Sequence, residues 1–431
     1  MAEASVIFRT AVRAADPEVL VRNTIHLHGS SLTIGARSHP LPSDARLLVI
    51  GIGKAAVRMG RGAMAALGAR VDGGLLVTKR GSDDPVERVG KLEVVRGGHP
   101  IPDATSEAAG VRILRLVRDL QPRDLVLMLI SGGASAVVEA PAAGLSLREI
   151  AAATEVLLRA GADIRMLNAV RRRLSRIKGG RLAREIAPAR VANLIISDVL
   201  GNPLPIIASG PTVADEQPGL DPVEVAASLG VWGELSAELR AVLVASRAGG
   251  QSPRNVLDSL VLADAATAAR AAAVAAGHLG YTAPVLATDF TGEARELARF
   301  WAAVARHARQ PGGPFRSPVC LIGAGETTVT VRGRGIGGRN TEMAVAAAAA
   351  IEGVEGLAIA SLATDGDDGL TDAAGGVVVG STVARARAAG IDPAAALDEN
   401  DTARFLAASG GLLVTGATGT NVNDLYLALL P

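Results

Sequence analysis

Two stretches, RLLVIGIGKAA at 46–56 and DLVLMLISGGASA at 124–136, decide the fold class of this chain. Each begins with a continuous run of Val, Ile, Leu or Met, which is typical of strands buried on both faces of a parallel sheet. Each run ends in glycines and small residues before a segment of helical composition. Three further runs, at 191–202, 319–330 and 357–369, end in glycine, Asp or Ser in a similar way. The repeated order predicts an α/β architecture with helices on both faces of the sheet.

The length of 431 residues allows two or three domains. Two stretches have the composition of linkers, SRAGGQSPRN at 246–255 and QPGGPFRSP at 310–318. We place the boundary at the first, because a long alanine-rich helix and a new series of strands and helices follow it. The sequence therefore predicts an N-terminal domain at 1–245 and a C-terminal domain at 246–431.

Composition and charge exclude several classes of protein. The 44 Lys and Arg residues against 43 Asp and Glu leave a net charge of +1, and only 2% of the residues are aromatic. A nucleic-acid surface needs a basic excess and stacking platforms, so no nucleic-acid partner is expected. The single cysteine, Cys320, excludes a disulfide framework and a CxxC zinc site, and it fits a reducing cytoplasm.

No segment has the pattern of a membrane anchor. The first 20 residues mix charged and apolar side chains, which predicts an amphipathic helix rather than a signal peptide. No apolar run approaches the ~20 residues that a membrane span requires. We therefore expect a soluble, cytoplasmic protein without a membrane partner.

GIGKAA satisfies the loose G-x-G-x-x-A dinucleotide pattern. A dehydrogenase would also need an acidic residue near the end of the next strand to hold the ribose. That strand ends in Lys79 and Arg80, and the nearby acid, Asp72, precedes it. Lys54 places an ammonium at a helix N-terminus, where anions are favoured; a solvated surface lysine is the alternative.

SGGASA at 131–136 is a second glycine loop after a buried run. Its backbone N–H groups can converge on a phosphate, and a purely structural turn is the alternative. The chain contains no Walker A loop, and it has no G-x-S-x-G nucleophile elbow. The sequence therefore excludes the nucleophile-elbow hydrolases.

Charged residues follow the later runs. Asp198 comes at a strand end, where a carboxylate can hold Mg²⁺ or accept a substrate proton and where helix capping is the alternative. In GAGETTVTVRGRGIGGRNTEMA at 323–344, Glu326 follows a glycine turn and Arg339 follows a glycine pair. Arginine after such a pair is suited to a carboxylate or phosphate, with a surface loop as the alternative.

Two more segments contribute polar side chains. ATDGDDGLTDAAGG at 363–376 contains an acidic cluster that includes Asp365; because the glutamate of an EF-hand is missing, we expect Mg²⁺ rather than Ca²⁺. TGATGTNVNDL at 415–425 can hydrogen-bond a polar ligand or cap a terminal helix. His99, in GGHPIPD, is expected to have a core or turn role.

These segments in this order closely resemble the type 2 glycerate kinases, the glycerate 2-kinases whose C-terminal half is the MOFRL domain. The motifs are GIGKAA, GGHPIPD, SGGASA, NAVRRRLSRIKGGRLA, SDVLGNP, ASGPT, GETTVTVRGRGIGGRNTE, TDGDDGLTDAAG and TGATGTNVNDL. The resemblance implies two α/β, Rossmann-like domains with largely parallel sheets and an active-site cleft between them. It also implies transfer of the γ-phosphate of ATP, with a divalent cation, to the 2-hydroxyl of D-glycerate, giving 2-phosphoglycerate.

By motif, the active-site lysine of the family falls on Lys54 and the arginine falls on Arg339. Where the family usually has a carboxylate after SDVxG, this chain has Asn202, so we do not predict a metal ligand there. Some relatives are labelled hydroxypyruvate reductase, which leaves an NAD(P)H-dependent reductase as the alternative activity. A homodimer is an open prediction.

The resulting hypothesis assigns residues to four roles. The residues predicted to be catalytic are Lys54, Arg339 and Asp198, with Asp198 or Asp365 accepting the hydroxyl proton. The residues predicted to bind the ATP phosphates are Ser131, Gly132, Gly133, Ser135, Gly325, Glu326 and Thr327. The residues predicted to bind D-glycerate are Lys54, Arg339 and Asn340. The residues predicted to bind Mg²⁺ are Asp198, Glu326 and Asp365.

Overall fold

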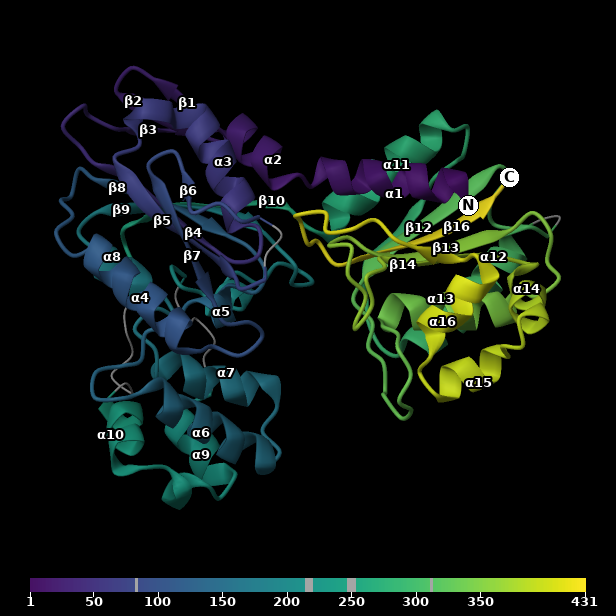
Figure 1. The fold of residues 1–431 in the computed structure, drawn as a ribbon. Helices are drawn as coiled ribbons and strands as arrows, with labels where there is room; N and C mark the ends of the chain where they lie inside the picture. The colour runs from purple at the N-terminus through teal and green to yellow at the C-terminus, as the bar shows by residue number, and fades with distance from the viewer. Residues whose placement is uncertain (82–83, 214–219, 246–252, 311–312) are drawn as a thin grey trace. The chain divides into compact units, whose positions relative to one another are not determined.

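Figure 1 shows the computed structural model, which describes residues 1–81, 84–213, 220–245, 253–310 and 313–431. Both predicted linkers are therefore covered only in part. Residues 246–252 of the first linker and residues 311–312 of the second lie outside the described residues. The class is α/β, as the sequence predicts.

The chain divides into two compact units. The N-terminal unit consists of Pro17–Ile196 and Asn202–Leu262. The C-terminal unit consists of Met1–Asp16, Ser197–Gly201 and Ala263–Pro431. Each unit has its own sheet. Two short segments, Met1–Asp16 and Ser197–Gly201, belong to the C-terminal unit although they come before the rest of that unit in the sequence.

This division differs from the predicted boundary between 245 and 246. Strand β10 (Val256–Ala263) follows the first linker and lies beside β9 (Arg190–Ile196) in the sheet of the N-terminal unit. Helix α1 (Ala2–Ala14), the expected amphipathic helix, packs against α11 (Ala265–His278) in the C-terminal unit. Linker composition marks an irregular segment, but it does not say which sheet the next strand joins.

The N-terminal unit contains a seven-stranded sheet in the order β10-β9-β8-β4-β5-β7-β6. In addition to β9 and β10, its strands are β4 (Leu47–Ile52), β5 (Gly73–Lys79), β6 (Arg88–Val89), β7 (Leu92–Gly97) and β8 (Leu125–Ile130). Neighbouring strands from β9 to β7 are parallel, and the edge strand β6 is antiparallel to β7. Every residue of β4 and β8 is buried, in agreement with their continuous apolar runs.

The strand order reverses between β4 and β8. From β4 the chain adds β5 and β7 on one side, and it then crosses over to add β8 and β9 on the other. Ile52 pairs with Ile130, so the carboxyl ends of β4 and β8 are level with each other. Ligands of open α/β sheets bind outside the carboxyl ends of the strands at such a reversal. GIGKAA and SGGASA follow these two strands.

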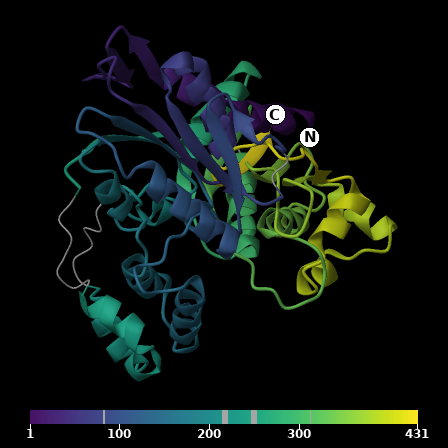
Figure 2. The same cartoon turned by 60° about the vertical axis from the view of Figure 1, so that its left-hand side comes forward.

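The remaining elements of the N-terminal unit surround this sheet. A small antiparallel sheet contains β1 (Ile25–His28), β2 (Ser31–Ile34) and β3 (Arg37–Pro40). The helices are α2 (Pro17–Thr24), α3 (Ala56–Leu67), α4 (Ala104–Leu116), α5 (Ala134–Val137), α6 (Leu147–Arg159), α7 (Ile164–Arg173), α8 (Arg181–Ile186), α9 (Pro222–Ser228) and α10 (Ala237–Ala245). Short 3₁₀ turns cover Gly68–Arg70, Ile207–Ser209 and Trp232–Glu234. Helices α6, α7, α9 and α10 form a lobe with its own apolar core (Figure 2).

The sheet of the C-terminal unit has the order β11-β12-β16-β13-β14-β15. Its strands are β11 (Val285–Phe290), β12 (Val319–Gly325), β13 (Ala358–Ala363), β14 (Gly375–Val379), β15 (Leu412–Leu413) and β16 (Asp424–Leu430). Only β11 and β12 form a parallel pair in this sheet among the described strands. The largely parallel pairing expected from the sequence thus holds in the N-terminal unit, whereas here β13 and β14 are joined without a crossover helix and pair antiparallel.

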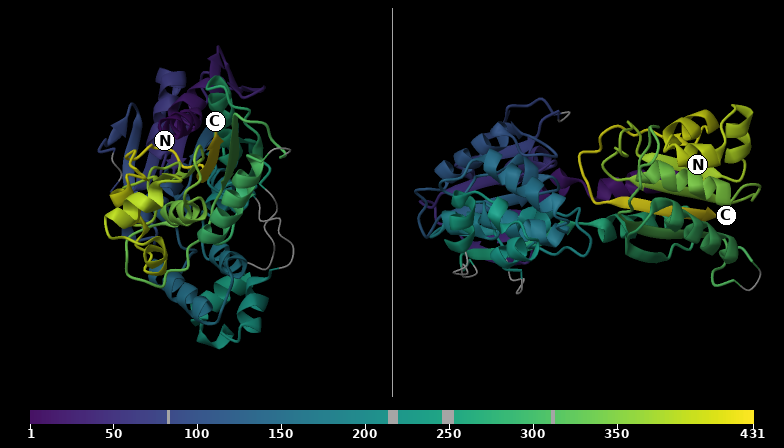
Figure 3. Two further views of the ribbon diagram at one scale, coloured as in Figure 1. Left: turned by 90° about the vertical axis from the view of Figure 1, so that its right-hand side faces the viewer. Right: turned by 90° about the horizontal axis from the view of Figure 1, so that it is seen from below.

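Helices cover both faces of this second sheet. They are α1 and α11 on one face and, on the other, α12 (Ala294–Ala308) and α13 (Arg339–Ala350), as Figure 1 shows. The smaller helices are α14 (Thr382–Ala388), α15 (Pro393–Asp398) and α16 (Thr402–Ser409). Strand β16 (yellow in Figure 3) lies in the middle of the sheet, and its seven residues are all buried. Within the described ranges, no helix is both long enough and apolar enough to cross a membrane.

Candidate active site

Two loops meet at the carboxyl ends of β4 and β8. Lys54 N donates to Gly132 O at 2.8 Å, and Ala55 N donates to Ser131 Oγ at 3.0 Å. Gly53 has a φ of +117°, and a Cβ at this position would lie 2.4 Å from Ser131 O. Only glycine permits so close an approach with this backbone conformation. The contacts hold Lys54, which is half-buried, beside the SGGASA loop.

The SGGASA loop presents a run of amides. Within the described residues, the N–H groups of 132–135 donate to no backbone or side-chain acceptor. Gly133 is left-handed, with a φ of +79°, and its carbonyl accepts from Ala136 and Val137 as the chain turns into α5. Successive amides without an internal acceptor favour an anion nearby. The phosphate-binding prediction for this loop stays a prediction with that support.

The two serines of this loop have different surroundings. Ser131 is buried, and its hydroxyl accepts from Ala55, so it ties the two loops together. Ser135 is half-buried, and its Oγ lies 2.8 Å from Ser209 Oγ. The hydroxyl of Ser135 is therefore the one at the surface of the loop, beside a second hydroxyl from the ASGPT segment.

His99 borders the same place. A Cβ built on Gly133 would lie 3.1 Å from His99 Nε2 and 3.2 Å from Lys54 Cγ, so the two side chains flank the loop. Burial lowers the pKa of His99, and the nearby Lys54 and Lys79 lower it further. The imidazole is thus neutral at neutral pH. In the GGHPIPD motif, the residue that caps α4 is Asp103 and not His99.

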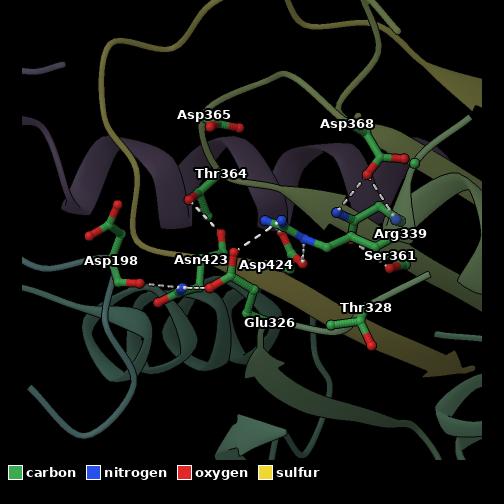
Figure 4. A network of polar contacts seen from close by, with 12 residues as sticks. Asp198, Glu326, Thr328, Arg339, Ser361, Thr364, Asp365, Asp368, Asn423 and Asp424 are labelled. Carbon is green, nitrogen blue, oxygen red and sulfur yellow. Dashed lines mark hydrogen bonds and ion pairs between the residues drawn. The ribbon is translucent and has the colours of Figure 1, made fainter. Parts of the chain in front are cut away.

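In the C-terminal unit, polar side chains gather at one end of the sheet. Strand β16 is antiparallel to both β12 and β13, so its first residue lies at the carboxyl ends of these two neighbours. Asp424 is accordingly paired with Gly325 and with Ala363. Figure 4 shows the side chains that surround Asp424.

Arg339 is held by carboxylates on two sides (Figure 4). Its Nε and Nη2 donate to Asp424 Oδ2 and Oδ1 at 2.5 and 3.0 Å, and its Nη1 lies 3.0 Å from Glu326 Oε1. Asp424 is fully buried, whereas the Glu326 side chain is 44% exposed. The guanidinium is therefore oriented from inside by Asp424 and reaches the surface beside Glu326. The predicted anion-binding arginine is present, but it already has carboxylate partners.

Burial and charge act in opposite directions on this pair. Burial raises the pKa of Asp424 to about 6, although the hydrogen bonds and charge of Arg339 lower it. Burial also disfavours the charged form of Arg339, but Asp424 and Glu326 outweigh this and raise its pKa. At neutral pH Asp424 is therefore ionised and balances the charge of Arg339.

Asn340, predicted to contact D-glycerate, is fully buried. Its backbone N donates to Asp368 Oδ1 at 2.9 Å, and its side-chain oxygen accepts from Ser361 Oγ at 2.7 Å. Asp368 also accepts from Thr341 N at 2.7 Å, so this carboxylate fixes the start of α13, where Arg339 is located. In this structure Asn340 supports the start of the helix, and its assignment to D-glycerate stays a prediction.

The three predicted metal ligands are separated into different contacts. Asn423 Nδ2 donates both to the backbone O of Asp198, at 2.7 Å, and to Glu326 Oε2, at 3.2 Å (Figure 4). The Asp365 side chain accepts from Asp367 N. Among the described residues, no three His, Cys, Asp or Glu side chains are grouped closely enough to hold one metal ion. The predicted set of three carboxylates thus does not form a single preorganised cage.

Two of the predicted nucleotide contacts lie inside the unit. A Cβ at Gly325 would lie 2.1 Å from Phe290 O, so the missing side chain makes room for β11 and not for a nucleotide. Thr327 is buried, and its hydroxyl has no hydrogen-bond partner in the described part of the chain. Of the three residues assigned to nucleotide binding in this segment, only Glu326 is exposed.

Comparisons with known proteins identify the family of the chain. Residues 3–244 match the family model "Domain of unknown function (DUF4147)", and residues 319–424 match the MOFRL family. A protein of Thermotoga maritima named D-glycerate 2-kinase is 41% identical to the chain, over 89% of this chain and 91% of its own length. The chain belongs to the glycerate kinase family.

Another member of similar sequence carries the provisional name hydroxypyruvate reductase. It comes from Agrobacterium vitis and is 38% identical over 98% of this chain and 93% of its own length. The fold has an experimental counterpart in a crystal structure of glycerate kinase from Thermotoga maritima. That structure has a TM-score of 0.90 and 38% identity, and it covers 100% of this chain and 99% of its own. The α/β fold and the family resemblance predicted from the sequence are thereby confirmed.

Two residues that organise the C-terminal group, Asn423 and Asp424, were not among the predicted site residues, although the sequence shows both as polar residues of a loop. Both lie in TGATGTNVNDL, which was expected to bind a polar ligand or cap a helix. Instead, the segment leads into β16. The available signal was the apolar run that follows, DLYLALL, which is typical of a buried strand with Asp424 at its start.

Proposed function

We propose that this chain transfers the γ-phosphoryl group of ATP to the 2-hydroxyl of D-glycerate, giving 2-phosphoglycerate and ADP. The observation that carries the proposal is the position of Lys54 at the strand reversal of the N-terminal unit, next to the amides of 132–135, which donate to no acceptor within the described residues. A cation and a row of N–H donors, with the imidazole of His99 as neighbour, suit a phosphate group. Membership of the glycerate kinase family supplies the acceptor.

Phosphoryl transfer asks the protein mainly to position the reactants and to neutralise charge. We assign to Lys54 and to the amides of the SGGASA loop the binding of anionic oxygens. The neutral state of His99 at neutral pH leaves Lys54 as the charged side chain beside this loop.

We assign to Arg339 a contact with an anionic group of the reactants. Its Nε and Nη2 are committed to the buried Asp424, whereas Nη1 is shared with the exposed Glu326. An exposed carboxylate can move away at small cost, because ion pairs at the surface contribute only ~0–1 kcal/mol. A substrate carboxylate or phosphoryl oxygen can then take the place of Glu326 while Asp424 keeps the guanidinium oriented.

The donor set of the C-terminal unit suits Mg²⁺, since carboxylate and amide oxygens are its usual protein ligands. Mg²⁺ usually keeps several waters and is bound through one or two carboxylates and the substrate phosphates, so a three-carboxylate cage is not required. Asp198 and Glu326, which Asn423 links, would hold it. Bound there, the ion would neutralise charge on the phosphates. We assign to Asp198, with Asp365 as the alternative, the acceptance of the 2-hydroxyl proton.

The alternative activity is reduction of hydroxypyruvate by NAD(P)H, which the loose GIGKAA fingerprint favours. Against it, Asp72 Oδ2 accepts from Leu47 N, the first residue of β4, and so this acid lies at the opposite end of the strand from GIGKAA. The end of β5, where a ribose-binding acid is needed, is Lys79. Lys79 and Arg80 would suit the extra phosphate of NADPH, so both nucleotides belong in the test.

One assay separates the two activities. The protein is incubated with D-glycerate and Mg-ATP while ADP is followed, and in parallel with hydroxypyruvate and NADH or NADPH while absorbance is followed. ADP formation that requires D-glycerate supports the kinase, and NMR of the product then identifies the phosphorylated position. Oxidation of NAD(P)H without any ADP formation would refute the proposal. The cytoplasmic location and the homodimer stay predictions.

A further inference from the structure

A buried ion pair in the N-terminal unit has no part in the proposed reaction. Lys178 Nζ lies 2.6 Å from Glu139 Oε2, and the two side chains are 1% and 2% exposed. Burial lowers the pKa of Lys178, and Glu139 opposes this shift. Glu139 Oε1 also accepts from Ser175 Oγ at 2.5 Å and from Ala140 N at 3.0 Å. Burying two charges gives little net stability compared with apolar packing, so the pair calls for another explanation.

The pair joins two segments that both lead to the SGGASA loop. Glu139 follows α5, the short helix that contains Ser135. Lys178 precedes a glycine pair whose amides donate to the ASGPT segment: Gly179 N to Ser209 O at 2.9 Å and Gly180 N to Gly210 O at 2.7 Å. The ion pair therefore connects the segment that bears Ser135 with the segment that holds Ser209.

The backbone of the ASGPT segment is strained where Ser209 is located. Ala208, Ser209 and Gly210 have φ values of 55°, 60° and 60°, a left-handed conformation that Ala and Ser rarely adopt. Residues kept in such a conformation cost about 1–3 kcal/mol each and cluster at functional sites. The result of this conformation is the short contact of Ser209 Oγ with Ser135 Oγ, at 2.8 Å.

We propose that the hydroxyl pair of Ser135 and Ser209 binds an anionic oxygen of a reactant at the SGGASA loop, and that Glu139 and Lys178 are positioning residues that set the spacing of this pair. The proposal rests on the proposed function. Of two hydroxyls that share one hydrogen bond, one keeps a proton to donate. The neighbouring amides of 132–135 have no acceptor in the part of the chain that the structure describes. A phosphate or carboxylate oxygen accepts from both kinds of donor.

Two variants of Ser209 separate the role of its hydroxyl in catalysis from the effect of its backbone conformation on folding. Ser209→Gly removes the hydroxyl and relieves the left-handed strain, whereas Ser209→Ala removes the hydroxyl and keeps the strain. We expect kcat/KM of both variants to fall about tenfold or more, with the Gly variant melting at or above the temperature of the Ala variant. Separate KM values for ATP and D-glycerate tell which reactant the hydroxyl contacts. Ser228→Ala, which removes a hydroxyl bonded to Val225 O on α9, is the control and should stay within twofold.

The ion pair is tested by replacing both charges. Glu139→Met with Lys178→Met removes the pair without leaving a buried charge, so the protein should fold with little change in melting temperature. We expect kcat to fall about tenfold. Because the pair acts through Ser209, adding these two changes to Ser209→Gly should lower kcat little further. Full additivity would refute the positioning role.

Failure of the inference is distinguishable from failure of the proposed function. If the wild type forms ADP and Ser209→Gly is as active as the wild type, the hydroxyl pair binds no reactant. If the wild type forms no ADP, the kinase proposal falls, and calorimetry with inorganic phosphate then decides the matter. Tighter binding by the wild type than by Ser209→Gly supports the pair, and equal binding refutes it.

Discussion

The contact between the GIGKAA and SGGASA loops predicts a severe effect for Gly53→Ala. A Cβ at Gly53 would lie 2.4 Å from Ser131 O and 2.5 Å from Ser131 Oγ, whereas ordinary contact begins at 3.4 Å. The loops must therefore separate by about 1 Å, and a misplacement of that size costs roughly 10²-fold in rate. Overpacking adds about 1–3 kcal/mol, and the φ of +117° adds about 1–3 kcal/mol for a non-glycine residue.

We expect Gly53→Ala to lower the free energy of unfolding by roughly 2–6 kcal/mol, the sum of these two costs, and the melting temperature by roughly 5–20 °C. The matched control is Gly68→Ala at the end of α3. Gly68 also has a positive φ, +51°, but nothing lies within 4 Å of its Cβ position. This control should show only the cost of strain, about 1–3 kcal/mol, with unchanged kcat/KM. Thermal unfolding and the ADP assay measure both quantities. A Gly53→Ala enzyme within threefold of the wild type, with the melting temperature of the control, would refute the contact argument.

Three further predictions concern charge and base recognition. Lys54→Met and Arg339→Ala should each lower kcat/KM by on the order of 10²-fold or more, and a loss below threefold in either would make its site assignment wrong. The pKa of His99 is lowered from its ordinary 6.5, so the stability that the neutral imidazole contributes is present above pH 6.5 and is lost as the pH falls through the lowered pKa. Denaturant unfolding at pH 5 and 7.5 should therefore show a larger loss of stability at pH 5 for the wild type than for His99→Gln. The same pH dependence in both proteins would contradict this prediction. GTP should replace ATP with a modest loss of kcat/KM, because only 2% of the residues are aromatic and Trp301 and Tyr426 among them are buried in the core. Strong discrimination against GTP would contradict this prediction.

The sequence predicted the features that depend on local pattern. The buried runs of β4 and β8 are continuous and end in glycine, so the strands and the loops after them could be placed correctly. Lys54 was assigned from its place after β4; its backbone N donates to Gly132 O, and the role of its side chain stays a prediction. The N-terminal helix α1 was likewise predictable from its alternation of charged and apolar residues.

Features that depend on pairing between distant segments could not be predicted in the same way. The importance of Asp424 arises because β16 is inserted between β12 and β13, which no local pattern indicates. Gly325 and Asn340 belong to the same sequence segment as Arg339. Adjacency in sequence does not reveal that Gly325 packs against β11 or that Asn340 is bonded to Asp368. The division into compact units differs from the predicted boundary for a related reason, since β10 joins a sheet whose other strands precede the linker.

The polar group at the SGGASA loop and the polar group around Arg339 contain different charges, and this difference bears on the chemistry that each can support. In the N-terminal unit, the cation of Lys54 and the N–H groups of 132–135 lie beside His99, whose pKa is lowered by burial and further by Lys54 and Lys79, so cations and hydrogen-bond donors predominate around this loop. In the C-terminal unit, Arg339 lies between Asp424 and Glu326, so carboxylates outnumber it. The first group suits an anion such as a phosphate. The second suits a divalent cation and the acceptance of a proton, and there the arginine can bind an anion only by replacing Glu326. The effect of Glu326→Gln should therefore depend on Mg²⁺ concentration, whereas that of Lys54→Met should not.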